Sequence, residues 1–155
     1  LIKKLRLNQE DGISALYLSD LYTKICEHKI SEAPEVFGAF NTLTELKKMR
    51  VKMFVSSATP TNTLQSIIGM RGWSELFDGI MGSPDSKENH LSSILFSNNY
   101  SLSEVIYIGD SEVDQKAALL TGCKFIGIGK NWNRFDSRPL VLLDNLEKLI
   151  KELKL

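Results

Sequence analysis

The sequence is poor in cysteine, carries no net charge and contains no long apolar run. Its 155 residues include only two cysteines, Cys26 and Cys123, too few for a disulfide framework or a zinc-ligand cluster. Basic and acidic residues number 19 each, which excludes the global basic field that attracts nucleic acid. No apolar stretch approaches the roughly 18 residues of a membrane helix. We therefore expect a cytoplasmic protein with reduced thiols that contacts neither nucleic acid nor membrane.

The composition is that of one globular domain. Hydrophobic residues make up 43% and charged residues 25% of the chain, and this length can bury a substantial core. The sequence starts at Leu1 without an initiator methionine or a signal-peptide pattern. We expect it to be a fragment of a longer protein.

The hydrophobic pattern changes repeatedly between helical and strand periodicity. It predicts a helix over about 13–28 and a second helix that begins at Ala33–Pro34. The apolar residues on one face of the second helix are Val36, Phe37, Phe40, Leu43 and Leu46. Short apolar runs predict further strands and helices in alternation, with strands at 51–56, 78–82, 105–108, 124–128 and 140–143, and helices at about 60–70, 86–97, 111–121 and 145–153. This order predicts an α/β fold, a Rossmann-like, mostly parallel sheet in three α/β/α layers. Residues 1–30 are predicted to be a separate helical element.

Polar residues that could bind an anion follow the first predicted strand and begin a later helix. Ser57 lies at a strand end, where the backbone N–H groups of the next helix favour a phosphate. The alternative is that Ser56, Ser57 and Thr59 are only turn and cap residues. Lys87 falls in the first turn of a helix, where a cation opposes the helix dipole. An anion within its reach would explain that position, and a solvated surface lysine is the alternative.

Two carboxylates, Asp110 and Asp114, lie at the end of the strand at 105–108 and in the first turn of the next helix. Such a pair is a plausible Mg²⁺ site, since Mg²⁺ is commonly held by one or two carboxylates with waters and phosphate oxygens. For Asp114 the favourable effect of an acid on the helix dipole is a sufficient alternative. His90 is predicted to be a surface or locally hydrogen-bonded residue, and Cys123 a buried, inert thiol.

In this order the motifs resemble the haloacid dehalogenase-like hydrolases, and more closely the phosphoglycolate phosphatase-like subgroup. The resemblance covers roughly residues 31–155 and rests on Val55–Ser56–Ser57–Ala58–Thr59–Pro60, Gly82–Ser83–Pro84–Asp85–Ser86–Lys87 and Ile108–Gly109–Asp110–Ser111–Glu112–Val113–Asp114. It implies hydrolysis of a small phosphorylated metabolite through an aspartyl-phosphate. By the same resemblance, the transferring phosphate would be bound by Ser57, Ala58 and Lys87, of which Ser57 and Lys87 would also be catalytic. Mg²⁺ would be bound by Asp110, with Asp114 as a further ligand or as a support for the ligands. Residues 1–30 resemble the last helices of a cap domain.

One motif of that family has no counterpart here. The expected Asp-x-Asp pattern after an apolar strand supplies the nucleophile, and the segment around Asp20 is helical in pattern instead. We expect the strand that carries it, central between those at 51–56 and 105–108, to be missing and the chain to have little or no turnover. The gap would be closed by direct pairing of those strands, by a segment such as 1–8, or by another chain, self-association included.

Two other functional classes stay open at this point. A non-catalytic module that lacks the nucleophile would still bind phosphate through Ser57 and Lys87. A flavodoxin-like receiver or nucleotide-binding domain uses the same strand-end geometry, but it needs an acidic pair after an early strand, which this order does not show.

Overall fold

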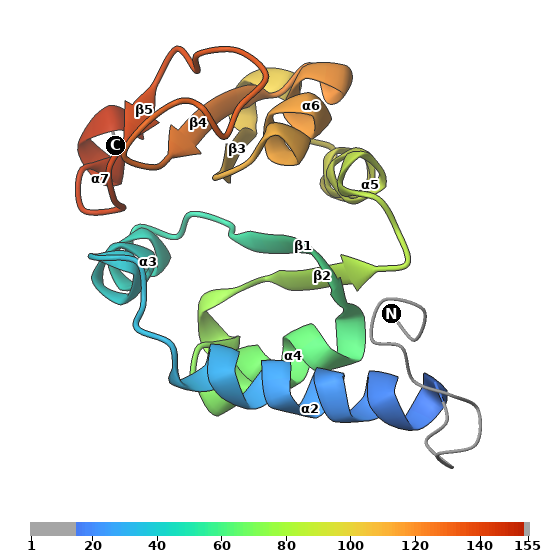
Figure 1. Ribbon diagram of the computed structural model, residues 1–155. Coiled ribbons are helices and arrows are strands. Elements are labelled where there is room, and N and C mark those ends of the chain that lie inside the picture. Colours follow the sequence, from blue (N-terminus) through green and yellow to red (C-terminus); the bar gives the residue numbers. More distant parts are fainter. Residues whose placement is uncertain (1–14, 154–155) are drawn as a thin grey trace.

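The computed structural model describes residues 15–153, arranged as helices around short parallel strands (Figure 1). The segment 1–8, considered above as a substitute strand, lies outside the described residues. The elements, in chain order, are α2 (Ala15–Glu32), α3 (Ala39–Lys48), β1 (Phe54–Pro60), α4 (Thr61–Met70), η2 (Ser74–Leu76), β2 (Gly79–Ser83), α5 (Lys87–Asn98), η3 (Leu102–Glu104), β3 (Ile106–Gly109), α6 (Glu112–Thr121), β4 (Lys124–Ile128), β5 (Leu142–Leu143) and α7 (Leu149–Leu153). Every predicted strand and helix is present, which confirms the α/β fold.

The strands form two separate parallel sheets. β1 pairs with β2, with Phe54 opposite Gly79, and the second sheet has the order β3-β4-β5. No strand pairing joins β1 to β3 within residues 15–153. The prediction of a mostly parallel arrangement is therefore confirmed. The proposal that the strands at 51–56 and 105–108 pair directly is wrong.

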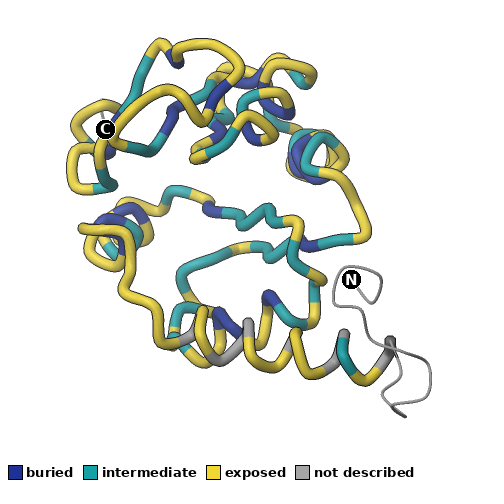
Figure 2. Tube along the Cα trace, in the orientation of Figure 1, coloured by how far each residue is buried: buried dark blue, intermediate teal, exposed yellow. Residues whose placement is uncertain are grey.

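The core is divided between the two faces of the strands. One buried cluster joins Leu46 of α3, Met53, Ile126 of β4, Leu143 and Leu149. The other is made of residues from α5, β3, α6 and the turn between α6 and β4, namely Leu91, Tyr107, Ala117, Ala118 and Cys123. Figure 2 shows buried residues in both halves of the molecule. The clusters cover opposite faces of β3, since Ile106 packs on the first cluster and Tyr107 belongs to the second.

The starts of three helices, α3, α4 and α7, differ from the prediction, and α7 begins at Leu149 instead of residue 145. α3 begins at Ala39 instead of Pro34, because Gly38 has a left-handed backbone with φ of 80° that a helix cannot pass through. Val36 and Phe37 consequently lie outside the helix, and both are exposed along with Phe40. β1 extends to Pro60, so α4 begins at Thr61 and Thr59 does not cap it. α3 thus starts several residues later than its sequence pattern indicates, and α4 starts one residue later.

Helix α2 packs beside α4 at the end of the molecule away from β3 (Figure 1). The guanidinium of Arg71, which follows α4, donates hydrogen bonds of 2.6 Å to the carbonyls of Ile30 and Ala33. The end of α2 is thereby attached to the β1-β2 half. No helix among the described residues is both long and apolar enough to cross a bilayer.

Candidate functional site

Lys87 and Asp114 form a close pair between the first turns of two helices. Ser86 caps α5 by accepting a hydrogen bond from the Asn89 N–H, which makes Lys87 the first residue of that helix. Its Nζ donates to Asp114 Oδ1 at 2.5 Å, and the two side chains are only 16% and 6% exposed. The pairing offsets the unfavourable position of a cation at a helix N-terminus. Two residues that the sequence singled out separately are therefore in direct contact.

The Asp114 carboxylate is saturated with hydrogen bonds. Oδ1 also accepts from the Tyr107 hydroxyl at 3.1 Å, while Oδ2 accepts from the Asp110 N–H, the Ser111 N–H and the Ser111 hydroxyl at 3.2, 3.1 and 2.6 Å. Ser111 and Asp114 together make a capping box at the start of α6. The carboxylate is thus held as an ion that fixes both Lys87 and the turn after β3.

These contacts determine the charge state of two buried groups. Burial by itself would raise the pKa of Asp114, but the hydrogen bonds from Lys87 and Ser111 and the charge of Lys87 outweigh it and lower this pKa below its usual value. Burial raises the pKa of Tyr107 far above its usual value. A hydrogen bond with Ser56 lowers the Tyr107 pKa by a smaller amount, and the negative charge of Asp114 opposes this effect. Asp114 is therefore ionised and Tyr107 is a neutral hydrogen-bond donor at neutral pH.

The close approach of the Asp114 side chain explains why a glycine, Gly109, precedes the acidic turn. A Cβ atom at this position would lie 2.3 Å from Cβ and 2.5 Å from Cγ of Asp114. Since real side chains do not approach so closely, the folded-back carboxylate requires glycine here. The Gly-Asp-Ser pattern in the sequence therefore corresponds to one compact structure around Asp114.

Asp110 has the opposite environment from Asp114. Its side chain is 57% exposed, and Oδ2 pairs with the Arg134 guanidinium at 3.0 Å. Arg134 comes from the loop between β4 and β5, and sequence analysis did not identify it because a basic residue in a loop has no distinguishing pattern. An exposed carboxylate at a strand end can accept a cation without a large desolvation cost.

Ser57 and Ala58 lie in the last residues of β1, and their contacts are local. The Ser57 hydroxyl accepts from the Thr59 N–H at 3.1 Å and donates to the Thr59 hydroxyl at 3.1 Å, as a turn residue would. Ala58 is exposed. No hydrogen bond joins Ser57 to Lys87 among the described residues. The structure thus connects Lys87 with Asp114 but leaves Ser57 with its own turn.

His90 links the helix of Lys87 to the strand of Ser57. It lies three residues after Lys87 on α5, only 4% exposed, with Nδ1 2.8 Å from the Ser56 hydroxyl and Nε2 3.2 Å from the Gly82 carbonyl. The prediction of a locally bonded histidine is confirmed, although its burial was not foreseen. Through His90, the end of β1 and the start of α5 are fixed relative to each other.

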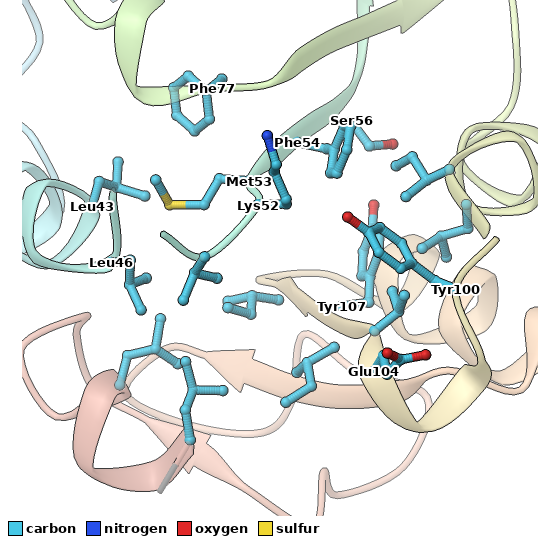
Figure 3. A pocket seen from close by; sticks show the side chains of 18 of the residues that line it. Leu43, Leu46, Lys52, Met53, Phe54, Ser56, Phe77, Tyr100, Glu104 and Tyr107 are labelled. Carbon is cyan, nitrogen blue, oxygen red and sulfur yellow. The ribbon is translucent and has the colours of Figure 1, made fainter. Parts of the chain in front are cut away.

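A slot of about 530 Å³ lies between β1 and β3 (Figure 3). The hydroxyl groups of Ser56, Tyr100 and Tyr107 gather on one side of it, and apolar side chains such as Leu46 and Phe77 line the other. Tyr107 connects the slot to the Lys87–Asp114 pair, because its hydroxyl binds Asp114. The polar side of the slot is therefore adjacent to the charged site.

The donor set suits a partly hydrated divalent cation better than a fully enclosed one. Within residues 15–153, no three or more His, Cys, Asp or Glu side chains converge as metal ligands. Asp110 offers an exposed carboxylate, whereas both oxygens of Asp114 are already engaged. One carboxylate with waters and phosphate oxygens is a common arrangement for Mg²⁺. Asp110 fits a direct ligand, and Asp114 fits a positioning role.

Comparison with known proteins places these observations in a family. Residues 1–128 match the family model described as haloacid dehalogenase-like hydrolase. A phosphoglycolate phosphatase of Photorhabdus laumondii is 27% identical over 146 residues, 88% of this chain and 62% of that one. A phosphoglycolate phosphatase of Pectobacterium atrosepticum is 29% identical over 118 residues, 70% of this chain and 50% of that one. The chain thus spans less than two thirds of the length of either relative.

Solved structures show the same fold. The crystal structure of a protein described as a predicted phosphoglycolate phosphatase from Haemophilus somnus superposes with a TM-score of 0.82 at 21% identity, covering 98% of this chain and 72% of that one. A haloacid dehalogenase-like family protein of Streptococcus pneumoniae superposes with a TM-score of 0.72 at 21% identity, covering 91% and 72%. At these identities the structures establish the fold alone.

Proposed function

Because this chain belongs to the haloacid dehalogenase-like hydrolase family, we propose that it is the phosphate-binding part of a phosphatase that hydrolyses monoesters of small metabolites. The observation that carries the proposal is the largely buried Lys87–Asp114 pair, in the turn that also presents the exposed carboxylate of Asp110. A transferring phosphoryl group needs positive charge and hydrogen-bond donors at one place. The phosphoglycolate phosphatases among the relatives support a small, anionic substrate.

Each residue has a distinct part in this proposal. Lys87, held by Asp114, would neutralise a phosphate oxygen, and the Ser57 hydroxyl with the N–H of Ala58 would donate hydrogen bonds to it. Asp110 would hold Mg²⁺, which spreads the charge of the phosphoryl group when it is bound. For Ser57 to reach the phosphate, its hydroxyl hydrogen must turn away from Thr59. This rotation is inexpensive for a half-buried hydroxyl.

The nucleophile is the missing part. The family resemblance implies a carboxylate after a central strand, and residues 15–153 have no strand between β1 and β3. Asp20, the one early candidate, lies within α2. We therefore propose that the chain binds phosphate but does not turn over esters unless that carboxylate is supplied. A non-catalytic phosphate-binding module is the alternative, and the same observation favours it.

Binding and turnover separate these proposals. Titration of inorganic phosphate in the presence of Mg²⁺, followed by calorimetry, should show saturable binding that Ser57→Ala weakens several-fold. Ser66→Ala, an exposed serine on α4, is the matched control and should change nothing. Absence of phosphate binding would contradict the proposed site.

A generic phosphate ester with Mg²⁺ gives the second measurement. No burst and no steady hydrolysis are expected from the chain alone. Robust turnover that Asp110→Asn abolishes would show that another residue serves as nucleophile and would overturn the proposal of an incomplete catalytic centre.

A further inference from the structure

A long loop between β4 and β5 carries Arg134 to the rim of the site (Figure 1). Residues 129–141 connect the two strands and contain no helix or strand. Ordered connections of this length without secondary structure are uncommon in compact domains, and they usually serve binding or catalysis. The guanidinium of Arg134 lies 3.0 Å from Asp110 Oδ2. The loop therefore places a cation beside the carboxylate that the proposed function assigns to Mg²⁺.

The backbone next to Arg134 is anchored to the core. Phe135 is 6% exposed and packs edge-on against Phe125 of β4, with ring centroids 5.8 Å apart. Its N–H donates to the Trp132 carbonyl at 3.0 Å, which closes a turn around residues 133 and 134. The backbone of Arg134 is therefore held in place, although its side chain is 62% exposed.

Gln115 of α6 anchors the next two residues of the loop. Its Oε1 accepts hydrogen bonds from the N–H groups of Asp136 and Ser137 at 3.1 and 3.3 Å, and its Nε2 donates to the Ser137 carbonyl at 3.0 Å. Gln115 directly follows Asp114, so the turn of α6 that holds Lys87 also holds this loop. The loop and the charged pair are therefore positioned by one helix.

The contact between Arg134 and Asp110 is one that a metal ion can displace. Their side chains are 62% and 57% exposed, and exposed ion pairs of this kind are weak. A cation bound at Asp110 would take the place of the guanidinium. Because the loop backbone is anchored, the displaced side chain would remain at the rim of the site.

We propose that Arg134 is a specificity-determining residue, which leaves Asp110 when Mg²⁺ binds and pairs with a carboxylate on the alcohol part of the substrate. A planar guanidinium can bind a carboxylate through two parallel hydrogen bonds. This inference rests on the proposed function and deepens it. It names the substrate class as phosphate monoesters of hydroxy acids.

The exposure of the two cations indicates which part of the substrate each would meet. Lys87 is 16% exposed and is held against Asp114, whereas Arg134 is 62% exposed and comes from the outer loop. Both belong to one site, because Asp114 binds Lys87 through Oδ1 and the Asp110 N–H through Oδ2. The exposed guanidinium therefore suits the outer, alcohol part of a substrate whose phosphate lies at the shielded lysine.

Two ligands that differ by one carboxylate test this inference on the full chain. 3-Phosphoglycerate and glycerol 3-phosphate share the phosphate and the carbon skeleton, but the first has a carboxylate where the second has a hydroxymethyl group. Each is titrated calorimetrically at saturating Mg²⁺, as is inorganic phosphate. The wild-type chain should bind 3-phosphoglycerate at least fivefold more tightly than glycerol 3-phosphate. Arg134→Gln should reduce this ratio below twofold and change the affinity for inorganic phosphate less than twofold.

Arg138→Gln is the matched control. It removes the same charge from an exposed arginine of the same loop and leaves the contact of Arg134 with Asp110 in place. Its ratio should equal that of the wild-type chain, whereas a general effect of charge would lower the ratio equally in both variants. Arg134→Lys keeps the charge but loses the planar fork, and it should give an intermediate ratio.

The outcomes separate this inference from the proposed function. A wild-type ratio below twofold, an unchanged ratio in Arg134→Gln, or an equal loss in the two glutamine variants would overturn the role of Arg134. Each of these results would leave the binding of inorganic phosphate, and with it the proposed function, intact. Failure of the wild-type chain to bind inorganic phosphate would instead contradict the proposed function and this inference together.

Discussion

The Nζ of Lys87 lies 2.5 Å from Oδ1 of Asp114, and the two side chains are largely shielded from water, at 16% and 6% exposed. This contact joins α5 to α6 and connects two residues 27 positions apart. The lysine and the aspartate stabilise each other's charge, and each would be a buried, uncompensated ion without the other.

We therefore predict that breaking this pair is strongly destabilising. Lys87→Met or Asp114→Asn should each lower the free energy of unfolding by about 3–5 kcal/mol, because each leaves a buried group without its partner. The double variant should lose less free energy of unfolding than the sum of the losses in the two single variants. Urea denaturation followed by circular dichroism measures these differences.

The matched control is another acid in the first turn of α6. Glu112 pairs with Lys116 on the surface, and Glu112→Gln should cost at most about 1 kcal/mol, as exposed pairs do. An equal cost for both positions would show that the Lys87–Asp114 pair is not effectively buried.

Stability should depend on pH through Asp114. Its pKa is lowered in the folded protein, so the stabilisation is complete above the usual aspartate value near 4 and is lost as the pH falls through the folded value. The wild-type protein should lose stability below about pH 4, and Asp114→Asn should lose less over the same interval. Urea unfolding between pH 3 and pH 7 measures both. Parallel curves for the two proteins would contradict a lowered pKa at this residue.

Gly109 should tolerate no side chain. Gly109→Ala forces a Cβ atom against the Asp114 side chain and should cost about 1–3 kcal/mol. Gly69→Ala is the control, since its Cβ would have no neighbour closer than 3.9 Å and its position within α4 favours alanine by about 0.5–1 kcal/mol. Thermal unfolding of both variants should therefore shift in opposite directions. If Gly109→Ala is neutral, the turn after β3 can move away from Asp114.

Arg134 should compete with a cation at Asp110. Arg134→Ala removes the guanidinium 3.0 Å from the carboxylate and should tighten Mg²⁺ binding about two- to fivefold, within the range of an exposed ion pair. Lys130→Ala removes an exposed charge from the same loop without that contact and should have a smaller effect. Calorimetric titration with MgCl₂ at low salt measures both. No difference between the variants would mean that the pair does not obstruct the carboxylate.

Much of the fold could be predicted because its determinants are local. The strand at 106–109 and the helix after it follow from an apolar run, a capping serine and the left-handed Gly122, all read within one segment. The predicted start of α3 was wrong because the sequence around Gly38 does not indicate that this residue has the left-handed backbone that delays the helix. Lys87 and Asp114 were both singled out, but their direct contact depends on how α5 packs against α6.

The remainder of the site depends on contacts that no single segment encodes. Arg134 reaches Asp110 from a loop 24 residues further along the chain. Burial of His90 depends on Ser56 and Gly82, which lie in two different strands. Only the three-dimensional arrangement reveals such partners.

The buried histidine also fixes the direction in which a nearby hydroxyl points. In the neutral ring, Nε2 must carry the proton because the Gly82 carbonyl can only accept, so Nδ1 is the acceptor. The Ser56 hydroxyl then has to give its hydrogen to the imidazole. The Ser56 oxygen can therefore only accept a hydrogen bond from a molecule that enters the space between β1 and β3. A molecule that presents an N–H or O–H group should bind there more favourably than one that presents only a carbonyl.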